Sequence, residues 1–164
     1  MSLIVLNIIR FVSFVFLQVA LFDHLDIFGF IEPYPYLLFI LMYSTHTNRY
    51  QFLLASFFLG LTIDVFHDSG AVHAVSSLIL AYIRPRLLRF SFGLSYQYHN
   101  VKVGDRINRE QLLFILIAIL IHHLVLFVLD SMSLSPRTLG VYLFCSVLTF
   151  LYCILIIFLI KQNK

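Results

Sequence analysis

Two long apolar stretches constrain the fold of this chain more than any other feature. They are "LLFILIAILIHHLVLFVL" (residues 112–129) and "VYLFCSVLTFLYCILIIFLI" (residues 141–160). Each is close to the roughly 20 residues that a helix needs to cross a hydrocarbon core about 30 Å thick. The chain is 61% hydrophobic and only 12% charged, whereas a soluble domain is close to half apolar and a quarter charged. The sequence therefore predicts a multi-pass membrane protein, and since hydrophobicity continues to the C-terminal end, the first apolar stretch is expected to be retained rather than cleaved as a signal peptide.

The apolar stretches predict an all-α integral membrane protein built as a six-transmembrane-helix bundle. Helices are expected because an open sheet would leave backbone groups unpaired in lipid. The predicted spans are residues 3–22, 34–47, 50–66, 70–88, 111–130 and 138–160. The only sizeable extramembrane piece is the loop 89–110, which is too short for an independent domain. Residues 1–164 are therefore expected to form a single transmembrane domain.

Basic residues divide unequally between the two sides of this bundle. The connections 23–35 and 67–70 contain no Lys or Arg, and the connection 131–137 contains only Arg137. Nine basic residues fall on the other side: Arg49, Arg84, Arg86, Arg89, Lys102, Arg106, Arg109, Lys161 and Lys164. Positive residues accumulate on the cytoplasmic side of membrane proteins, so both termini are expected in the cytoplasm. The loop 89–110, rich in Phe, Tyr and Arg, would lie against the headgroups or dock a cytoplasmic partner.

Small and polar residues recur along the third and fourth predicted helices. Their spacing of three or four residues forms one stripe on each helix: Ser56, Gly60, Asp64 and Asp68 on the third, and Gly70, Ala74, Ser77 and Ala81 on the fourth. Small residues let two helices approach closely in a membrane. We therefore expect these helices to form a tight hairpin.

Asp64 is a carboxylate inside an apolar helix. An ionised side chain there costs at least about 2.5 kcal/mol, so it is expected to face protein. The fourth helix is predicted to begin near Asp68–Gly70, where its first N–H groups need acceptors and where Asp68 or Ser69 would be the N-cap. Our hypothesis is that Asp64 is a structural staple that accepts a further N–H or binds His73, aided by the positive end of the helix dipole.

Metal or proton chemistry is a weaker alternative for the same residues. It would use Asp64, His67, Asp68 and His73, with His122 or His123. Their spacing matches no closed ligand set, so no metal or cofactor is expected. Adjacent helix residues point about 100° apart, so one of the two neighbouring histidines is expected to bond between helices and the other to point elsewhere. The sequence contains no recognisable nucleophile–base pair, so an enzyme is not expected. It also contains no nucleotide-binding loop, and no nucleic-acid partner is expected.

Arg84, Pro85 and Arg86 are predicted to end the fourth helix. Proline disrupts a helix interior, and the two arginines would sit among negatively charged headgroups as a topological anchor. Partner binding is the alternative role for these arginines. Cys145 and Cys153 lie too far apart on one helix to form a disulfide and are expected to be small buried side chains.

Residues 59–88, "LGLTIDVFHDSGAVHAVSSLILAYIRPRLL", resemble the central segment of the bacterial rod shape-determining protein MreD family. The resemblance lies in an ordered set of residues: Gly60, Asp64, Gly70, His73, Ala74, Arg84 and Pro85. "PYPYLLFILM" (residues 33–42) and "LIHHLVLFVLDSMSL" (residues 120–134) are similar to the flanking segments of that family. The loop 89–110 and the last helix match only in character.

The resemblance implies a non-enzymatic, inner-membrane component of the cell-elongation machinery. Proteins of this family partner MreC and act with the MreB filament, RodA and a class B penicillin-binding protein to direct peptidoglycan synthesis and rod shape. The resemblance also implies an architecture similar to the S-components of energy-coupling-factor transporters. A small-solute-binding subunit of such a transporter is therefore the alternative function. Membrane lipids are expected partners in either case, and formation of a homodimer is left open.

Overall fold

All regular elements in the described part of the chain are helices. The computed structural model describes residues 3–22, 32–45, 47–93, 108–131 and 136–162. Its elements are α1 (Leu3–Leu17) with the π-helical continuation η1 (Gln18–Phe22), α2 (Leu37–Met42), α3 (Arg49–His67), α4 (Val72–Phe92), α6 (Arg109–Ser131) and α7 (Pro136–Gln162). The all-α prediction is confirmed for these residues.

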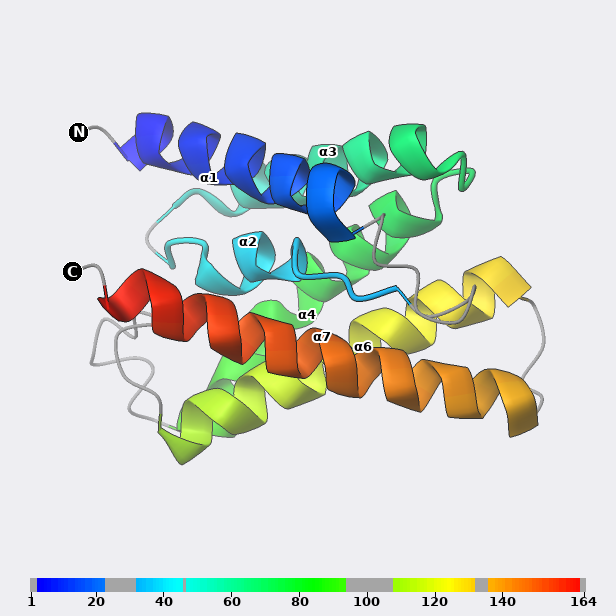
Figure 1. Ribbon diagram of the computed structural model, residues 1–164. Coiled ribbons are helices and arrows are strands. Elements are labelled where there is room, and N and C mark those ends of the chain that lie inside the picture. The colour runs from blue at the N-terminus through cyan, green and yellow to red at the C-terminus, as the bar shows by residue number, and fades with distance from the viewer. Residues whose placement is uncertain (1–2, 23–31, 46, 94–107, 132–135, 163–164) are drawn as a thin grey trace.

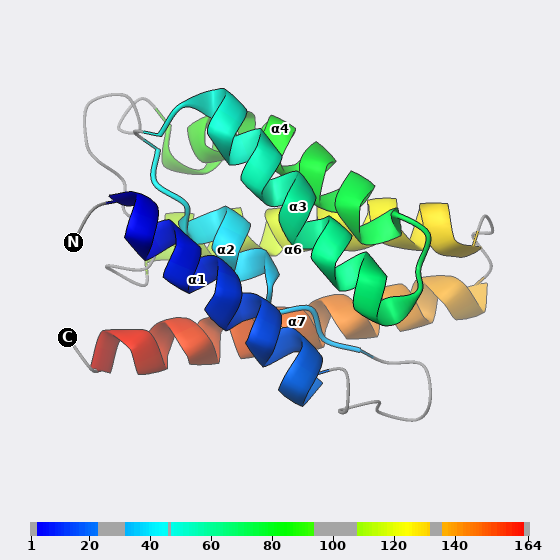
Figure 2. The same cartoon turned by 90° about the horizontal axis from the view of Figure 1, so that it is seen from above.

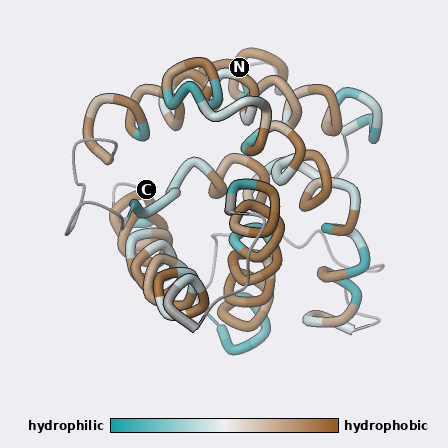
Figure 3. Tube along the Cα trace, turned by 90° about the vertical axis from the view of Figure 1, so that its right-hand side faces the viewer, coloured by the Kyte–Doolittle hydropathy of each residue, from teal (hydrophilic) through white to brown (hydrophobic). Residues whose placement is uncertain are grey.

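Four helices are long and apolar enough to cross a membrane. They comprise Ile4–Phe22, Arg49–His67, Arg109–Asp130 and Thr138–Gln162. Hydrophobic residues predominate along them, as Figure 3 shows, and this supports a multi-pass membrane protein. The predicted spans 34–47 and 70–88 are not among these four helices.

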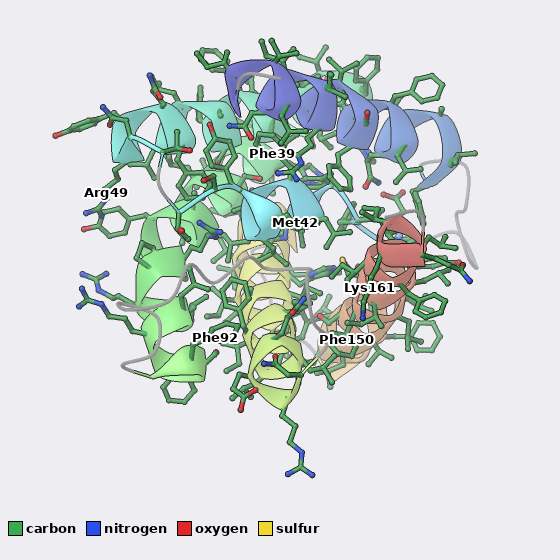
Figure 4. The ribbon with its side chains drawn as sticks, turned by 90° about the vertical axis from the view of Figure 1, so that its left-hand side faces the viewer. Phe39, Met42, Arg49, Phe92, Phe150 and Lys161 are labelled. Carbon is green, nitrogen blue, oxygen red and sulfur yellow. The ribbon has the colours of Figure 1, made fainter. Side chains whose placement is uncertain are left out.

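The prediction of a helical span over residues 34–47 is wrong, because α2 has only six residues. Pro33 and Pro35 lack N–H donors, so the chain enters without helix and then tightens through bonds from Leu38 N to Pro35 O and from Phe39 N to Tyr36 O, each 3.0 Å long. We call residues 32–43 the inner segment. From Pro33 to Leu41 every residue is buried, and Figure 4 shows α2 in the middle of the longer helices.

The predicted end of the fourth helix is also wrong. Pro85 lies inside α4, which continues to Phe92, so the predicted loop 89–110 begins in a helix; residues 94–107 of that loop lie outside the described residues. At 21 residues, α4 is about 32 Å long, which is enough to cross a membrane. Its arginines and serines make α4 more polar than the four apolar helices. It packs most extensively against α3 and α6, and it buries several of its polar residues.

The helices run side by side (Figures 1 and 2), and basic residues gather at one end of the bundle. At this end α1, α3 and α6 begin and α4 and α7 end. Its basic residues are Arg49, Arg86, Arg89, Arg109 and Lys161. We call it the basic end, and we call the opposite end, where α3 meets α4, the turn end.

The outer faces of α1 and α7 are apolar and exposed. On α1, Ile4, Val12 and Phe16 are 70%, 59% and 70% exposed, and α7 similarly exposes Leu143, Val147 and Leu151. Such faces suit contact with lipid, because the hydrocarbon core favours apolar side chains.

Candidate functional site

The two helices of the α3–α4 hairpin touch backbone to backbone at Gly60. A Cβ added there would lie 2.6 Å from the Cα of Ala74 and would overlap the carbonyl of His73. Ser56, Gly60, Ala74, Ser77 and Ala81 are all buried. The close approach predicted from the small residues is therefore present, and it brings the side chain of Asp64 onto the first turn of α4.

Asp64 caps α4 from the neighbouring helix. Its Oδ1 accepts hydrogen bonds from His73 N at 2.9 Å and from the Ser69 hydroxyl at 2.5 Å, and its Oδ2 accepts one from Ala74 N at 2.8 Å. The N-cap residue of α4 is Ala71, whose side chain has no acceptor. Asp64 therefore supplies the oxygen that an N-cap side chain normally gives to the second or third helical N–H. The contact expected between Asp64 and the start of the fourth helix is present.

The roles predicted for Asp68, Ser69 and Gly70 are wrong. Asp68 is exposed and ends α3 with a positive φ of 52°, so it neither continues the buried stripe nor caps α4. Ser69 donates to Asp64 instead of capping the helix. Gly70 also has a positive φ, 63°, and precedes α4 with no atoms near its missing Cβ. These residues form the turn, because α4 begins later than the sequence pattern indicates.

The side chain of His73 points away from Asp64 to a tyrosine in the inner segment. The Tyr36 hydroxyl lies 3.0 Å from His73 Nδ1 and 2.9 Å from His122 Nε2. A hydroxyl has one hydrogen, so Tyr36 donates to one imidazole and accepts an N–H from the other. This shared hydroxyl joins the inner segment to α4 and α6. The other nitrogen of His122, Nδ1, is buried and has no hydrogen-bond partner among the described residues.

His123 is bonded between helices as well, contrary to the expectation that only one of the adjacent histidines would be. Its Nε2 lies 3.2 Å from the Thr149 hydroxyl on α7, and its Nδ1 lies 3.0 Å from the carbonyl of Ile119. Thr149 also accepts a hydrogen bond of 3.0 Å from Tyr34 N. His122 therefore contacts the inner segment and His123 contacts α7, because adjacent side chains on a helix point about 100° apart.

The prediction that Arg84 anchors the helix among headgroups is wrong. Arg84 is only 3% exposed, and its Nη2 donates to the carbonyls of Leu41 and Tyr43 at 3.0 and 2.6 Å. Its guanidinium also lies 5.1 Å from the centre of the Phe52 ring. The last carbonyls of a helix lack intrahelical donors, so this cation completes the C-terminal end of α2. Pro85, the next residue, lies inside α4.

The start of the inner segment is held by further polar contacts. Gln18 donates from Nε2 to the carbonyl of Pro33 at 3.2 Å. Tyr34 donates to Glu32, whose carboxylate lies 3.7 Å from His67 Nδ1. Helices α3, α4, α6 and α7 and the element η1 therefore all place polar side chains around this one irregular segment. Irregular backbone is tolerated at membrane depth where protein supplies its hydrogen bonds.

The sequence reasoning missed Tyr34, Tyr36, Gln18 and Thr149. The "PYPY" at residues 33–36 was the available signal, since two prolines so close together oppose a helix.

The described residues contain no cluster of three or more His, Cys, Asp or Glu able to hold a metal ion. Cys145 and Cys153 are free and buried. Chemically, the site is a network that joins helices through neutral and charge-assisted hydrogen bonds. No protein-family model, curated protein or solved structure matches the chain.

Proposed function

We propose that this protein is a non-enzymatic scaffold of the bacterial cytoplasmic membrane, of the MreD type, that binds MreC and helps organise peptidoglycan synthesis for rod shape. In this proposal the inner segment and α4 count as the second and fourth of six passages, and the basic end faces the cytoplasm. Action with RodA, a class B penicillin-binding protein and, indirectly, MreB would follow from that partnership. The sequence resemblance names these partners.

The observation that supports a scaffold is the use made of the buried polar groups. Both oxygens of Asp64 accept hydrogen bonds, Arg84 binds two carbonyls, and the Tyr36 hydroxyl has two partners. Groups paired in this way hold helices together. They are poorly placed for catalysis, because catalysis needs a base or nucleophile that is accessible to the reacting atom of the substrate. The interior is built to hold one arrangement of helices.

The exterior offers surfaces for a membrane partner. α1 and α7 present long apolar faces, and helices in a membrane associate through van der Waals packing and a few polar contacts. A single transmembrane helix such as a scaffold partner contributes would have room along either face.

The alternative is the solute-binding subunit of an energy-coupling-factor type of transporter. Such a subunit needs convergent polar groups around a cavity that opens outward. Asp64 and His73, two buried polar residues near the turn end, are bonded to other protein groups instead. This favours the scaffold over the transporter subunit.

Affinity capture from native membranes tests the two functions. The tagged protein, solubilised in mild detergent, should retain MreC and no ATPase module, whereas an unrelated multi-pass protein with the same tag should retain neither. Retention of an ATPase module with a bound solute would favour the transporter subunit. Depletion should also round the cells, and normal rod shape after depletion would contradict the proposal.

A further inference from the structure

A cavity of about 490 Å³ lies between α1, α2 and α3 near the basic end. This volume falls within the roughly 300–1,000 Å³ typical of small-molecule sites. The lining residues are Ile4, Asn7, Ile8, Phe11, Phe39, Tyr43, Thr47, Asn48, Gln51 and Ala55. None of them is used in the network around Asp64, Tyr36 and Arg84 except Tyr43, which contributes its backbone carbonyl there.

On the side formed by α2, α3 and the chain between them, the lining changes from polar to apolar with depth. Tyr43, Thr47, Asn48 and Gln51 surround the part near the start of α3, at the basic end. Phe11, Phe39 and Ala55 line the part further toward the middle of the bundle, since each lies further along its element from that end. A site with this gradient suits a molecule that has a polar head and an apolar chain.

The cavity is bordered on the lipid side by exposed residues of α1. Ile4 is 70% exposed and Ile8 is 57% exposed, so an occupant can enter sideways from the bilayer. Arg49, which follows the lining residue Asn48, lies at the edge of the bundle (Figure 4), with its guanidinium 5.1 Å from the centre of the Tyr82 ring on α4. The basic end therefore places positive charge at the level where anionic lipid phosphates lie, and among the described residues no acidic side chain lines the cavity to repel them.

Asn7 provides a specific polar contact within the lining. Its amide interacts with the side chain of Tyr43, and its side-chain oxygen is buried with no hydrogen-bond partner among the described residues. A buried unpaired acceptor is unfavourable, so a bound headgroup that carries an N–H or O–H donor would be preferred over one that carries none.

We propose that this cavity binds one acyl chain of a glycerophospholipid from the leaflet at the basic end, with a donor-bearing headgroup at the polar rim. A transmembrane helix is about 10 Å wide and would not enter a space of this volume, whereas a single acyl chain fits it. The site depends only on insertion of the protein in a membrane and is independent of the scaffold function proposed above.

Native mass spectrometry of the detergent-purified full chain tests the site. The wild type should carry one tightly held phospholipid. Ala55→Trp, which fills the deep part of the cavity, should lower its occupancy at least tenfold. Leu54→Trp is the matched control, because Leu54 is 57% exposed and does not line the cavity, and it should retain the lipid. Absence of lipid from the wild type, or equal occupancy in both variants, would overturn the proposal.

A second variant guards against misfolding of Ala55→Trp. Ile8→Trp lies at the exposed border of the cavity and should reduce occupancy while leaving the helical circular dichroism unchanged. In nanodiscs, wild type should favour phosphatidylethanolamine or phosphatidylglycerol over phosphatidylcholine, which has no headgroup donor, by about tenfold. Asn7→Leu should reduce that preference several-fold. Retention of a peptide in place of lipid, or an equal preference for all three lipids, would contradict the proposed occupant.

Discussion

Asp64 and Arg84 are both buried charges that complete the end of a helix, and they do so at opposite ends of the molecule. Asp64 is 5% exposed and Arg84 is 3% exposed. The anion accepts N–H groups at the start of α4, and the cation donates to carbonyls at the end of α2. Each charge therefore has the sign that the helix dipole favours at its site.

The two sites differ in how far their partners lie along the chain. The partners of Asp64 are five, nine and ten residues away, in the turn and just across it. Those of Arg84 are 43 and 41 residues away, on an element that the sequence pattern predicts as a longer helix. A buried charge next to a turn can thus be assigned a partner from the sequence, whereas one in mid-helix cannot.

Replacing each charge by leucine should give the largest effects. Asp64→Leu leaves three donors without their acceptor, at about 1–3 kcal/mol each, and should abolish folded protein. Arg84→Leu leaves two carbonyls without this donor and should cost less, though still several kcal/mol. The yield of monodisperse protein in size-exclusion chromatography would measure both.

Conservative variants sharpen the same comparison. Asp64→Asn keeps one acceptor oxygen and Arg84→Lys keeps a cationic donor, so each should lower the melting temperature only moderately. Because the chain has no tryptophan, far-ultraviolet circular dichroism is the suitable probe of melting. Equal tolerance of Asp64→Asn and Asp64→Leu would remove the structural role assigned to this carboxylate.

Gly60→Ala should disturb the Asp64 site and leave the Arg84 site intact. The added methyl would overlap the backbone of α4, so the helices must separate, at a cost of about 3 kcal/mol. Gly70→Ala is the matched control. It meets no atoms and should cost only about 1 kcal/mol, from its positive φ. Thermal melting of the two variants would separate close packing from turn strain, and similar melting temperatures would contradict the close approach of α3 and α4.

Tyr36→Phe tests whether the inner segment is coupled to the Asp64 site, to the Arg84 site or to both. It removes a hydroxyl shared by His73 and His122 and should lower stability by about 2 kcal/mol. In a double-mutant cycle it should couple to Asp64→Asn, since His73 belongs to both contacts, and should be nearly additive with Arg84→Lys. Strong coupling to Arg84→Lys instead would indicate that the inner segment responds as one rigid unit.

The smallest effect is expected at the turn between α3 and α4, and it should stabilise the protein. Ala71 is exposed with a φ of 72°, a conformation that costs a residue with a Cβ about 1 kcal/mol. Ala71→Gly should therefore raise the melting temperature slightly. Ala74→Gly, in the buried part of the same helix, should lower it. A lower melting temperature for Ala71→Gly would exclude strain in this turn.

Local information was sufficient for much of the outer framework. Apolar stretches near 20 residues long indicated α1, α3, α6 and α7, because a membrane demands continuous hydrophobic length. The small residues Gly60 and Ala74 indicated the close α3–α4 hairpin, because only a short turn separates the two helices. The place of Asp64 beside the start of α4 followed from the same proximity.

Only the tertiary structure decided how the inner segment crosses the bundle and which groups hold it. Apolar residues favoured a helix over residues 34–47. The surrounding helices instead supply hydrogen bonds to this segment, and these bonds stabilise an irregular backbone inside the bundle. For the same reason Arg84 is buried: its carbonyl partners become available only once α2 has ended against α4. Sequence by itself determined which segments prefer lipid, because that preference is local, whereas the pairing of buried polar groups depends on elements that meet only in the folded chain.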